Sequence, residues 1–276
     1  MKEIQKVILN IFKNVKQILY NFNIPYYAIG GTCLGAIRHH GFIPWDDDLD
    51  IAVPIEYWDR LIEVMKSELP EYLYLYTPDN VKPYHYVWLK VCDKRTTFIE
   101  KSEFDLKEAY KGVFIDIMPI GGIPAETKDR EKFIQKLRHL DSYNNHLRFS
   151  DSYSTLKSFL GRLPFRILSR ILPYNYYSKK YMEILKEHPF VNSSFVGYTW
   201  HPEWLPRLVF PKSYFNDGID VQFEDTLIKV PQDYHRYLSQ QFGNYMQLPP
   251  ENRREVHIGF IDLNKPYSFY YKNRLN

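Results

Sequence analysis

The segment 44–53, PWDDDLDIAV, joins a run of aspartates directly to an apolar stretch that is typical of a buried strand. In an extended chain, alternate side chains share a face. We therefore expect Asp46, Asp48 and Asp50 to lie on one face of this strand, opposite the apolar side chains that alternate with them. The apolar face would belong to the core, and the acidic face would form a site.

Carboxylates clustered in this way repel one another. At an effective dielectric of about 20, two like charges roughly 4 Å apart repel by about 4 kcal/mol. The three aspartates would therefore take up protons or hold a cation. A hard divalent ion, Mg2+ or Mn2+, is the natural counter-charge for carboxylate oxygens. The alternative is an aspartate-rich turn without a metal, since Asp is a common turn residue.

A glycine pair and a short helix precede the acidic segment. Residues 26–29 are a β-prone run, Gly30-Gly31-Thr32 follows them, and residues 33–40 have the pattern of a short helix. Glycines let the backbone approach a ligand closely, Thr32 can cap the helix, and free N–H groups at a helix N-terminus attract phosphate. This order predicts a phosphate site beside the metal site, which is typical of phosphoryl or nucleotidyl transfer.

A further carboxylate stands alone in an apolar segment. Every residue of the segment 112–119 is apolar except Asp116, and turn-forming residues bound it, so the segment is typical of a buried strand. A single buried carboxylate is costly unless it is paired or bound to a metal. One interpretation is a salt bridge to a buried Arg or Lys. We favour the other, in which Asp116 shares a metal site with Asp48 and Asp50, because one divalent ion would satisfy all three.

Three basic residues are candidates to neutralise the phosphates of a substrate. Arg38 lies on the helix after the glycines, Lys90 lies in a predicted strand over 84–92, and Arg95 follows that strand. Each could instead be an ordinary solvated charge. Mg2+ alone rarely neutralises a diphosphate and the charge that develops in the transition state. We therefore expect some of the three to face the phosphates.

Three segments of the chain carry a family resemblance: GGTCLGAIRHHGFIPWDDDLDIAV (residues 30–53), GVFIDIMPIGGIP (112–124) and FGNYMQLPPENRREVH (242–257). In this order they resemble the LicD family of phosphocholine and related phospho-alcohol transferases, which are distant relatives of fukutin-type enzymes. The first segment is long and specific, the other two are moderately specific, and the match spans most of the chain.

The resemblance implies an α/β (α+β) fold with a nucleotidyltransferase-like mixed sheet flanked by helices. It also implies a DxD metal motif on Asp48 and Asp50, with Asp46 adjacent, a nucleotide-activated donor such as CDP-choline, and an acceptor hydroxyl on a cell-surface glycan. Fukutin-related members carry a Cys-rich zinc insertion. This chain has only Cys33 and Cys92, which are too few for such a site, so no zinc is expected.

The composition agrees with a cytosolic enzyme of ordinary size. The chain has 276 residues, of which 45% are hydrophobic, and a formal charge of +3. So small a charge gives no argument for nucleic acid as the main partner, and we expect none. Two cysteines far apart predict no disulfide framework. No signal peptide or membrane span of about 18 apolar residues is apparent. We expect a cytoplasmic protein that would meet a membrane-borne glycan precursor at the inner face of the membrane.

Helical patterns lie at both ends of this predicted core. Apolar residues recur at helical spacing over 4–22, and we favour packing of this helix on the sheet over a membrane-surface role for its lysines. Helices are also predicted over 126–149 and 155–187. The second contains a stretch rich in basic and aromatic residues that could contact an anionic membrane or a lipid-linked acceptor. An internal helix pair is the favoured alternative.

A hairpin is predicted over 219–230, and a helix from Pro231 to Gly243 follows it. The loop beyond this helix is stiffened by two prolines. Its acceptor-side candidates are Tyr245, Arg253 and His257. We divide the chain into a nucleotidyltransferase-like catalytic core over 1–123 and a mainly helical C-terminal region over 124–276, packed on the core as one unit.

These features predict a Mg2+-dependent transferase with Asp48, Asp50 and Asp116 as catalytic residues. It would move phosphocholine, or a related phospho-alcohol, from a CDP-activated donor to a sugar hydroxyl of a glycan such as teichoic acid, capsule or lipopolysaccharide. Two alternatives stay open: a nucleotidyltransferase that uses a nucleoside triphosphate, and a non-catalytic glycan- or nucleotide-binding protein of the same fold. The released product, CMP or pyrophosphate, separates the first alternative from the predicted reaction.

Overall fold

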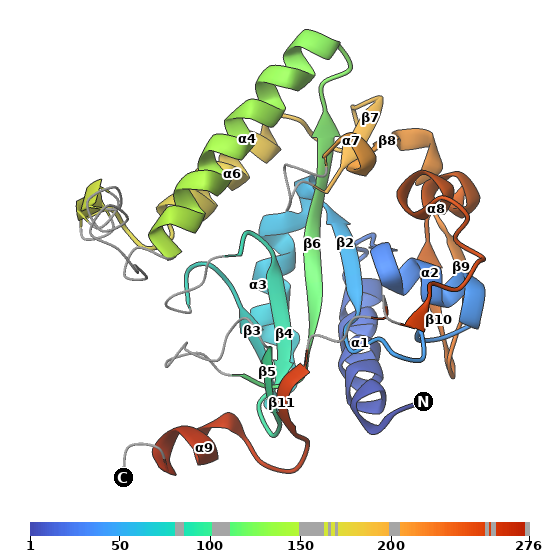
Figure 1. The fold of residues 1–276 in the computed structure, drawn as a ribbon, viewed down its shortest axis with the longest axis vertical. Coiled ribbons are helices and arrows are strands. Elements are labelled where there is room, and N and C mark those ends of the chain that lie inside the picture. Colours follow the sequence, from blue (N-terminus) through green and yellow to red (C-terminus); the bar gives the residue numbers. More distant parts are fainter. Residues whose placement is uncertain are drawn as a thin grey trace.

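The computed structural model describes residues 1–80, 86–100, 111–148, 163–164, 167–168, 171–198, 205–251, 254 and 258–273. These residues form an α/β fold in which helices flank a mixed β-sheet (Figure 1). The predicted fold class is therefore confirmed.

The main sheet has the strand order β1-β2-β6-β4-β3, and β7 and β8 extend it from the C-terminal end of β6. Its strands are β1 (Tyr27–Ala28), β2 (Asp50–Pro54), β3 (Leu73–Tyr76), β4 (Leu89–Asp93), β6 (Phe114–Ile123), β7 (Phe195–Gly197) and β8 (Val209–Pro211). β2 and β6 are parallel, and the other neighbouring strands are antiparallel. The N-terminal ends of β2 and β6 therefore lie side by side.

Helices and two small two-stranded sheets complete the described structure. The helices are α1 (Glu3–Asn21), α2 (Gly30–His39), α3 (Trp58–Glu68), α4 (Thr127–Arg148), α6 (Tyr176–Lys186), α7 (Leu205–Leu208), α8 (Tyr234–Phe242) and α9 (Tyr267–Asn273), with short 3-10 turns at Ile55–Tyr57 and Lys212–Tyr214. The small sheets pair β5 (Thr97–Glu100) with β11 (Ile258–Asp262) and β9 (Ile219–Phe223) with β10 (Thr226–Val230). No described helix combines the length and the apolar character needed to cross a bilayer.

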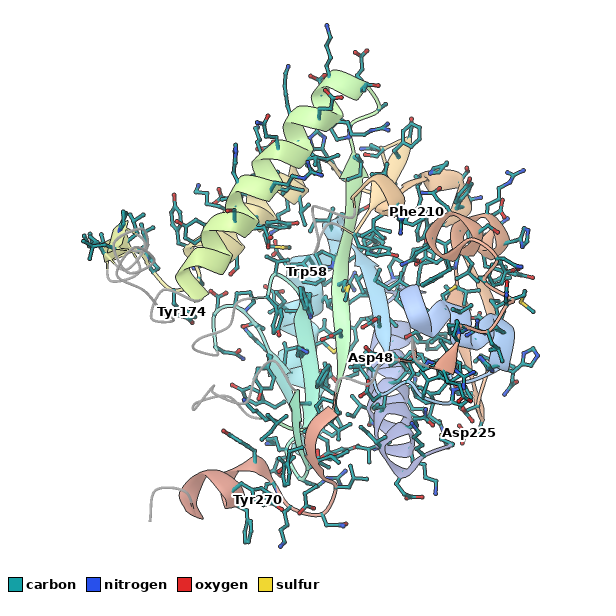
Figure 2. All side chains as sticks on the ribbon, viewed as in Figure 1. Asp48, Trp58, Tyr174, Phe210, Asp225 and Tyr270 are labelled. Carbon is teal, nitrogen blue, oxygen red and sulfur yellow. The ribbon has the colours of Figure 1, made fainter. Side chains whose placement is uncertain are left out.

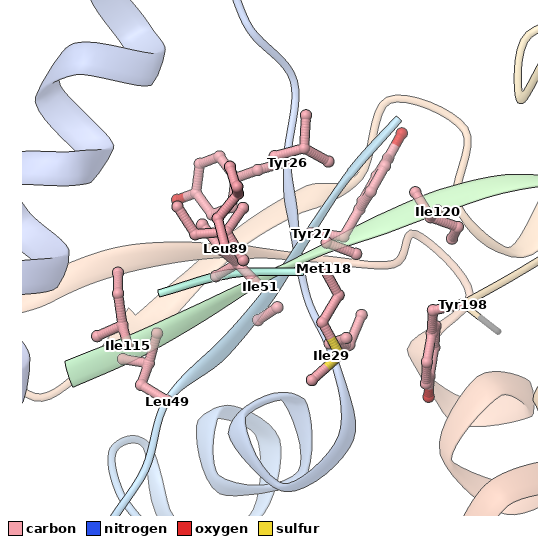
Figure 3. Close-up of a cluster of buried hydrophobic side chains, with 14 of the residues drawn as sticks. Tyr26, Tyr27, Ile29, Leu49, Ile51, Leu89, Ile115, Met118, Ile120 and Tyr198 are labelled. Atoms are coloured by element: carbon pink, nitrogen blue, oxygen red, sulfur yellow. The ribbon is translucent and has the colours of Figure 1, made fainter. Parts of the chain in front are cut away.

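The core forms where β1, β2, β4 and β6 pack together (Figure 3). Ile51, Leu89 and Ile115 are fully buried there. Burying one such side chain is worth about 1.5–3 kcal/mol. A slip of one residue would turn these side chains out of the core, so their burial holds the register of the strands.

The N-terminal amphipathic helix packs on the sheet, as predicted. Its apolar side chains Ile8, Ile11 and Phe12 are fully buried, and α1 contacts β4, β6 and α3. Two of its lysines contact the β9–β10 hairpin. Lys13 Nζ lies 2.7 Å from a carboxylate oxygen of Asp225, and Lys16 donates to a hairpin carbonyl. The helix therefore joins the sheet to the hairpin.

The C-terminal region matches part of its prediction. The β9–β10 hairpin is confirmed, and α4 agrees with the helix predicted over 126–149. α8 ends at Gly243, which takes a φ of 67°, as predicted. It begins at Tyr234 and not at Pro231, because Asp233 caps it by accepting a hydrogen bond from the Arg236 N–H.

One expectation for this region was wrong in detail. The helix predicted over 155–187 is interrupted before α6, because a turn at 172–175 contains Pro173, which cannot continue a helix. Residues 155–162 lie outside the described structure. The region also contributes β7, which pairs with Gly121–Ile123 of β6, and β11, which pairs with β5. Such short strands contain too few residues to show a periodic pattern, and each is stabilised by its pairing with an adjacent strand. Sequence periodicity therefore does not reveal them. The division at residue 123 stays a prediction.

Gly122→Ala is expected to lower the free energy of unfolding by about 1–3 kcal/mol, the usual cost of overpacking. The Gly122 N–H donates to the His188 carbonyl at 2.7 Å. A Cβ at this position would overlap Ser193 Oγ and lie 2.9 Å from the His188 oxygen. Gly121→Ala is the matched control, because the nearest atom to its Cβ would be the His188 carbonyl oxygen at 3.5 Å. Denaturant unfolding compares the two, and equal losses would contradict this packing account.

Candidate active site

Three neighbouring strands place Asp50, Asp116 and Lys90 in one row across the sheet. Asp50 at the start of β2 is the Cα partner of Asp116 in β6. On the other side of β6, Asp116 is the partner of Lys90 in β4. The Asp116 N–H donates to the Leu49 carbonyl at 2.9 Å, which fixes the pairing at the entrance to both strands. Segments that are remote in sequence therefore meet at one point.

Asp116 forms the salt bridge that one interpretation expects, and it also lies beside the acidic segment, as the shared metal site of the other interpretation requires. Lys90 Nζ lies 3.4 Å from Asp116 Oδ1, and both side chains are largely buried. At the same time, Asp116 stands beside Asp50 in the register of the sheet. A salt bridge to a buried lysine and a place in the carboxylate cluster are thus not exclusive. Lys90 belongs to this row, although the strand predicted over 84–92 begins only at Leu89, and residues 84–85 are outside the described structure.

A second group of carboxylates lies just before β2. Oxygens of Asp46, Asp47 and Asp48 all lie within 4.8 Å of one another. Figure 2 shows Asp48 where β2 begins. The expected alternation is wrong here, because the extended strand starts only at Asp50 and the chain before it is irregular. Asp47, which is buried, therefore joins its neighbours. Sequence reasoning missed Asp47, and its adjacency to the other aspartates was the available signal.

The electrostatics of Asp50 connect the two groups of carboxylates. Burial raises the pKa of Asp50 well above its usual range, and the nearby carboxylates of Asp48, Asp116 and Asp46 raise it further, in that order. The positive charge of Lys90 acts in the opposite direction. Three carboxylates and one ammonium thus act on Asp50, and Asp47 lies beside two of those carboxylates. Such a concentration of negative charge favours a bound cation.

The glycine pair lies directly against this cluster. A Cβ on Gly30 would lie 3.9 Å from Asp50 Oδ2, and one on Gly31 would lie 3.1 Å from Asp46 Oδ2. Thr32 does not cap α2, since Ile29 occupies the N-cap position. The helix starts three residues earlier than predicted because Gly30 accepts a φ of 54°. Thr32 Oγ1 instead accepts a hydrogen bond from the Asp50 N–H at 2.8 Å, which ties the helix to β2.

Two buried tyrosines, which sequence reasoning missed, hold the start of α2. The Gly30 N–H donates to the Tyr237 hydroxyl at 2.9 Å, and the Tyr237 and Tyr198 hydroxyls lie 2.9 Å apart. Both rings are almost fully buried. Burial raises the pKa of both phenols, so both stay neutral. Tyrosine is so frequent in this chain, with 24 residues, that no sequence signal distinguished these two.

Arg38 joins α2 to the C-terminal loop. Its Nη1 donates to the Tyr245 carbonyl at 2.7 Å, and its Nε lies 3.0 Å from His39 Nε2. The Tyr245 ring is buried, and its hydroxyl lies 3.0 Å from His235 Nδ1. The other two predicted acceptor-side residues, Arg253 and His257, lie outside the described structure.

The loop also approaches the acidic segment through a residue that was not predicted. The Arg254 guanidinium carbon lies 4.5 Å from the centre of the Trp45 ring, next to the first aspartate. Arg254 Nε donates to the Pro249 carbonyl at 3.3 Å. This cation–π contact links the loop to the edge of the carboxylate cluster.

Arg95 is engaged elsewhere. It forms a bidentate pair with Asp93, with Nε at 2.9 Å from Oδ1 and Nη2 at 2.6 Å from Oδ2. Its guanidinium carbon lies 3.9 Å from the centre of the Tyr72 ring. Asp93 lies at the end of β4 and pairs with Leu73, whereas Lys90 pairs with Asp116. The structure therefore does not bring Arg95 to the carboxylates.

The carboxylate cluster fits a hard divalent cation. All its donor atoms are carboxylate oxygens, the ligands that Mg2+ and Mn2+ prefer. Two oxygens on opposite sides of one Mg2+ are about 4.2 Å apart, at about 2.1 Å from the ion. The oxygens of Asp46, Asp47 and Asp48, within 4.8 Å of one another, need only small movements to reach such a spacing. Asp50 and Asp116 lie on the sheet side of the same cluster.

A mixed sheet with carboxylates at the start of two parallel strands, beside a glycine-led helix, is typical of nucleotidyltransferase-like enzymes of phosphoryl transfer. The family model described as LicD/FKTN/FKRP, nucleotidyltransferase domain, matches residues 23–165, about half of the chain. The chain therefore belongs to the LicD family, which confirms the resemblance drawn from its sequence and makes it a phosphotransferase.

Individual relatives agree with this family. The chain is 29% identical over 273 residues, 93% of its own length and 95% of the relative, to the lipopolysaccharide cholinephosphotransferase LicD of Haemophilus influenzae. It is 36% identical over 96 residues, 34% of each chain, to an uncharacterized protein of Rickettsia prowazekii. A segment of 43 residues, 16% of this chain and 14% of the relative, is 49% identical to an uncharacterized protein of Rickettsia typhi.

Proposed function

We propose that the protein is a Mg2+-dependent transferase that moves phosphocholine from CDP-choline to a sugar hydroxyl of a cell-surface glycan or its precursor. The observation that carries this proposal is the meeting of Asp50 and Asp116 with the acidic segment beside the glycine-led helix. The near full-length likeness to a cholinephosphotransferase supports the choice of phosphocholine. Glycerol, ribitol and ethanolamine phosphates are the related groups to be compared with it.

In this proposal Asp48 and Asp50 hold the metal, Asp46 is adjacent, and Asp116 completes the site. Mn2+ is the expected substitute for Mg2+. When bound, the ion would supply positive charge that offsets the charge on the donor phosphates and on the leaving group. The phosphates would approach α2 at Gly31 and Thr32. The Gly30 N–H already donates to the Tyr237 hydroxyl, so it would not bind a phosphate. Gly30 would instead let the phosphates come close to the backbone, because it has no side chain.

The reaction balances as a single displacement. The acceptor hydroxyl attacks the phosphorus distal to the nucleoside, a new phosphate ester bond forms, and the bond to the bridging oxygen of the diphosphate breaks. CMP leaves with that oxygen, and the hydroxyl proton passes to a base, for which Asp116 is the candidate. Lys90, which pairs with Asp116, and Arg38, on the glycine-led helix, are the candidates to meet the donor phosphates. Arg95 has no part, because Asp93 holds it.

The acceptor would be presented by the loop after α8, which carries Tyr245, Arg253 and His257. A sugar of lipopolysaccharide is the first acceptor to test, and teichoic acid and capsule are the others. A lipid-linked acceptor would be met on the cytoplasmic side of the membrane, through peripheral contact. No nucleic acid takes part.

The test is a panel of CDP-alcohols mixed with Mg2+, followed by analysis of the products. We expect CDP-choline to raise the melting temperature most among CDP-choline, CDP-glycerol, CDP-ribitol and CDP-ethanolamine, and only with the metal present. Turnover with a glycan acceptor should release CMP. Release of pyrophosphate from a nucleoside triphosphate would favour a nucleotidyltransferase instead. Binding without any turnover, over all acceptors, would favour a non-catalytic binding protein.

A further inference from the structure

Lys90 places a positive charge against the carboxylates. Its Nζ lies 3.4 Å from Asp116 Oδ1, and the two side chains are about 10% and 11% exposed. It also acts on the charge of Asp50, which is the register neighbour of Asp116. Because both partners are largely shielded from water, their attraction is stronger than that of a surface pair.

Two aromatic rings also lie against the ammonium. Lys90 Nζ lies 3.5 Å from the centre of the Phe114 ring and 5.1 Å from that of Tyr86. Phe114 is two residues before Asp116 on β6, so the ring and the carboxylate stand on the same face of that strand. A cation over an aromatic face is stabilised by the ring quadrupole. Lys90 is thus fitted between a ring and a carboxylate, and it is not an ordinary solvated lysine.

This position has a consequence for metal binding. A divalent ion that reaches Asp116 enters the same small space as the ammonium, and the two positive charges repel. Either the ion does not contact Asp116, or the Lys90 ammonium moves to another position. The long, unbranched stem of lysine lets its ammonium turn while the stem stays buried.

We infer that Lys90 is the resident counter-ion of the carboxylate site, which neutralises Asp116 in the metal-free protein and gives way toward the donor phosphates when the metal binds. This inference rests on the metal site of the proposed function. It assigns Lys90 two partners in turn, first a carboxylate and then a phosphate. The lysine would limit repulsion among the aspartates while no ion is present, and it would weaken the affinity for the ion.

Lys90→Met tests the inference, because methionine keeps an unbranched stem and removes the charge. The probes are Mn2+ and Mg2+ alone, with affinity measured by titration calorimetry and stability measured by thermal unfolding. We expect the variant to melt at a lower temperature without metal, to bind Mn2+ about ten-fold more tightly, and to gain more stability from the ion than the wild type does. If Lys90→Met does not fold, Lys90→Gln provides the same comparison.

Three controls separate this role from a general loss of packing. Lys90→Arg keeps the charge, so its ion affinity should stay near that of the wild type. Lys111→Met removes another buried lysine, one whose Nζ lies 5.9 Å from the centre of the Tyr267 ring on α9, and should leave ion affinity unchanged. In the Asp116→Asn background, Lys90→Met should have much less effect on affinity, because a coupled pair is not additive.

The outcomes separate the inference from the proposed function. If wild-type protein binds neither ion, the proposed metal site is wrong, and the role inferred for Lys90 is wrong as well. If the wild type binds Mn2+ and Lys90→Met binds it with unchanged or weaker affinity, the inference alone is wrong and the proposed function stands. Tighter binding by Lys90→Met and not by Lys111→Met supports the inference.

Discussion

Asp48→Asn and Asp50→Asn are each expected to abolish transfer while the metal-free protein stays at least as stable as the wild type. Each substitution removes one of several carboxylates that repel one another, so the metal-free form loses repulsion and no packing volume. For Asp50 the argument is stronger, because its pKa is already raised by burial and by its acidic neighbours. Asparagine removes the negative charge that this burial and these neighbours disfavour.

The measurements are turnover, Mn2+ affinity and melting temperature with and without the ion. Asp225→Asn is the control, because Asp225 lies exposed on the β9–β10 turn (Figure 2) and pairs with Lys13 of α1. It should keep full turnover and full ion affinity. A site variant that melts far below the wild type without metal, yet binds the ion with wild-type affinity, would show that the carboxylate is structural.

Asp116→Asn is expected to reduce turnover by a factor of about one hundred or more, the scale for losing a preorganised charged group. It should also weaken the stabilisation gained from Mg2+ plus a CDP-alcohol. The metal-free variant should lose stability as well, because Lys90 would be left in the sheet without its carboxylate. Breaking a buried pair typically costs about 3–5 kcal/mol.

The pairing with Lys90 changes which measurement decides the role of Asp116. A loss of stability without metal no longer distinguishes a salt bridge from a shared metal site, because Asp116 takes part in the bridge in either case. The decisive quantity is the gain in melting temperature on adding metal and donor. Asp93→Asn is the matched control, since it breaks another buried aspartate from a basic partner, Arg95, and should leave that gain intact. An undiminished gain in Asp116→Asn would refute the shared site.

Local patterns determined much of the fold. The amphipathic helix α1, the β9–β10 hairpin, and the end of α8 at Gly243 followed from periodicity and turn chemistry, which act within a few residues. The burial of Ile51 and Ile115 followed from their apolar segments. The predicted boundaries of elements were wrong where contacts with residues distant in sequence outweigh local preferences. The start of α2 at Gly30 depends on Tyr237 and on the Asp50 N–H, both distant in sequence from the glycine.

The family resemblance, the acidic segment and the isolated Asp116 as a candidate for the same site were all predictable from the amino-acid sequence. The row formed by Asp50, Asp116 and Lys90, the place of Asp47 beside Asp46 and Asp48, and the pairing of Arg95 with Asp93 became visible only in the folded chain. The physical reason is strand register. Which residues face one another across β2, β6 and β4 depends on packing of the whole core, and a single residue of slip would separate these charges.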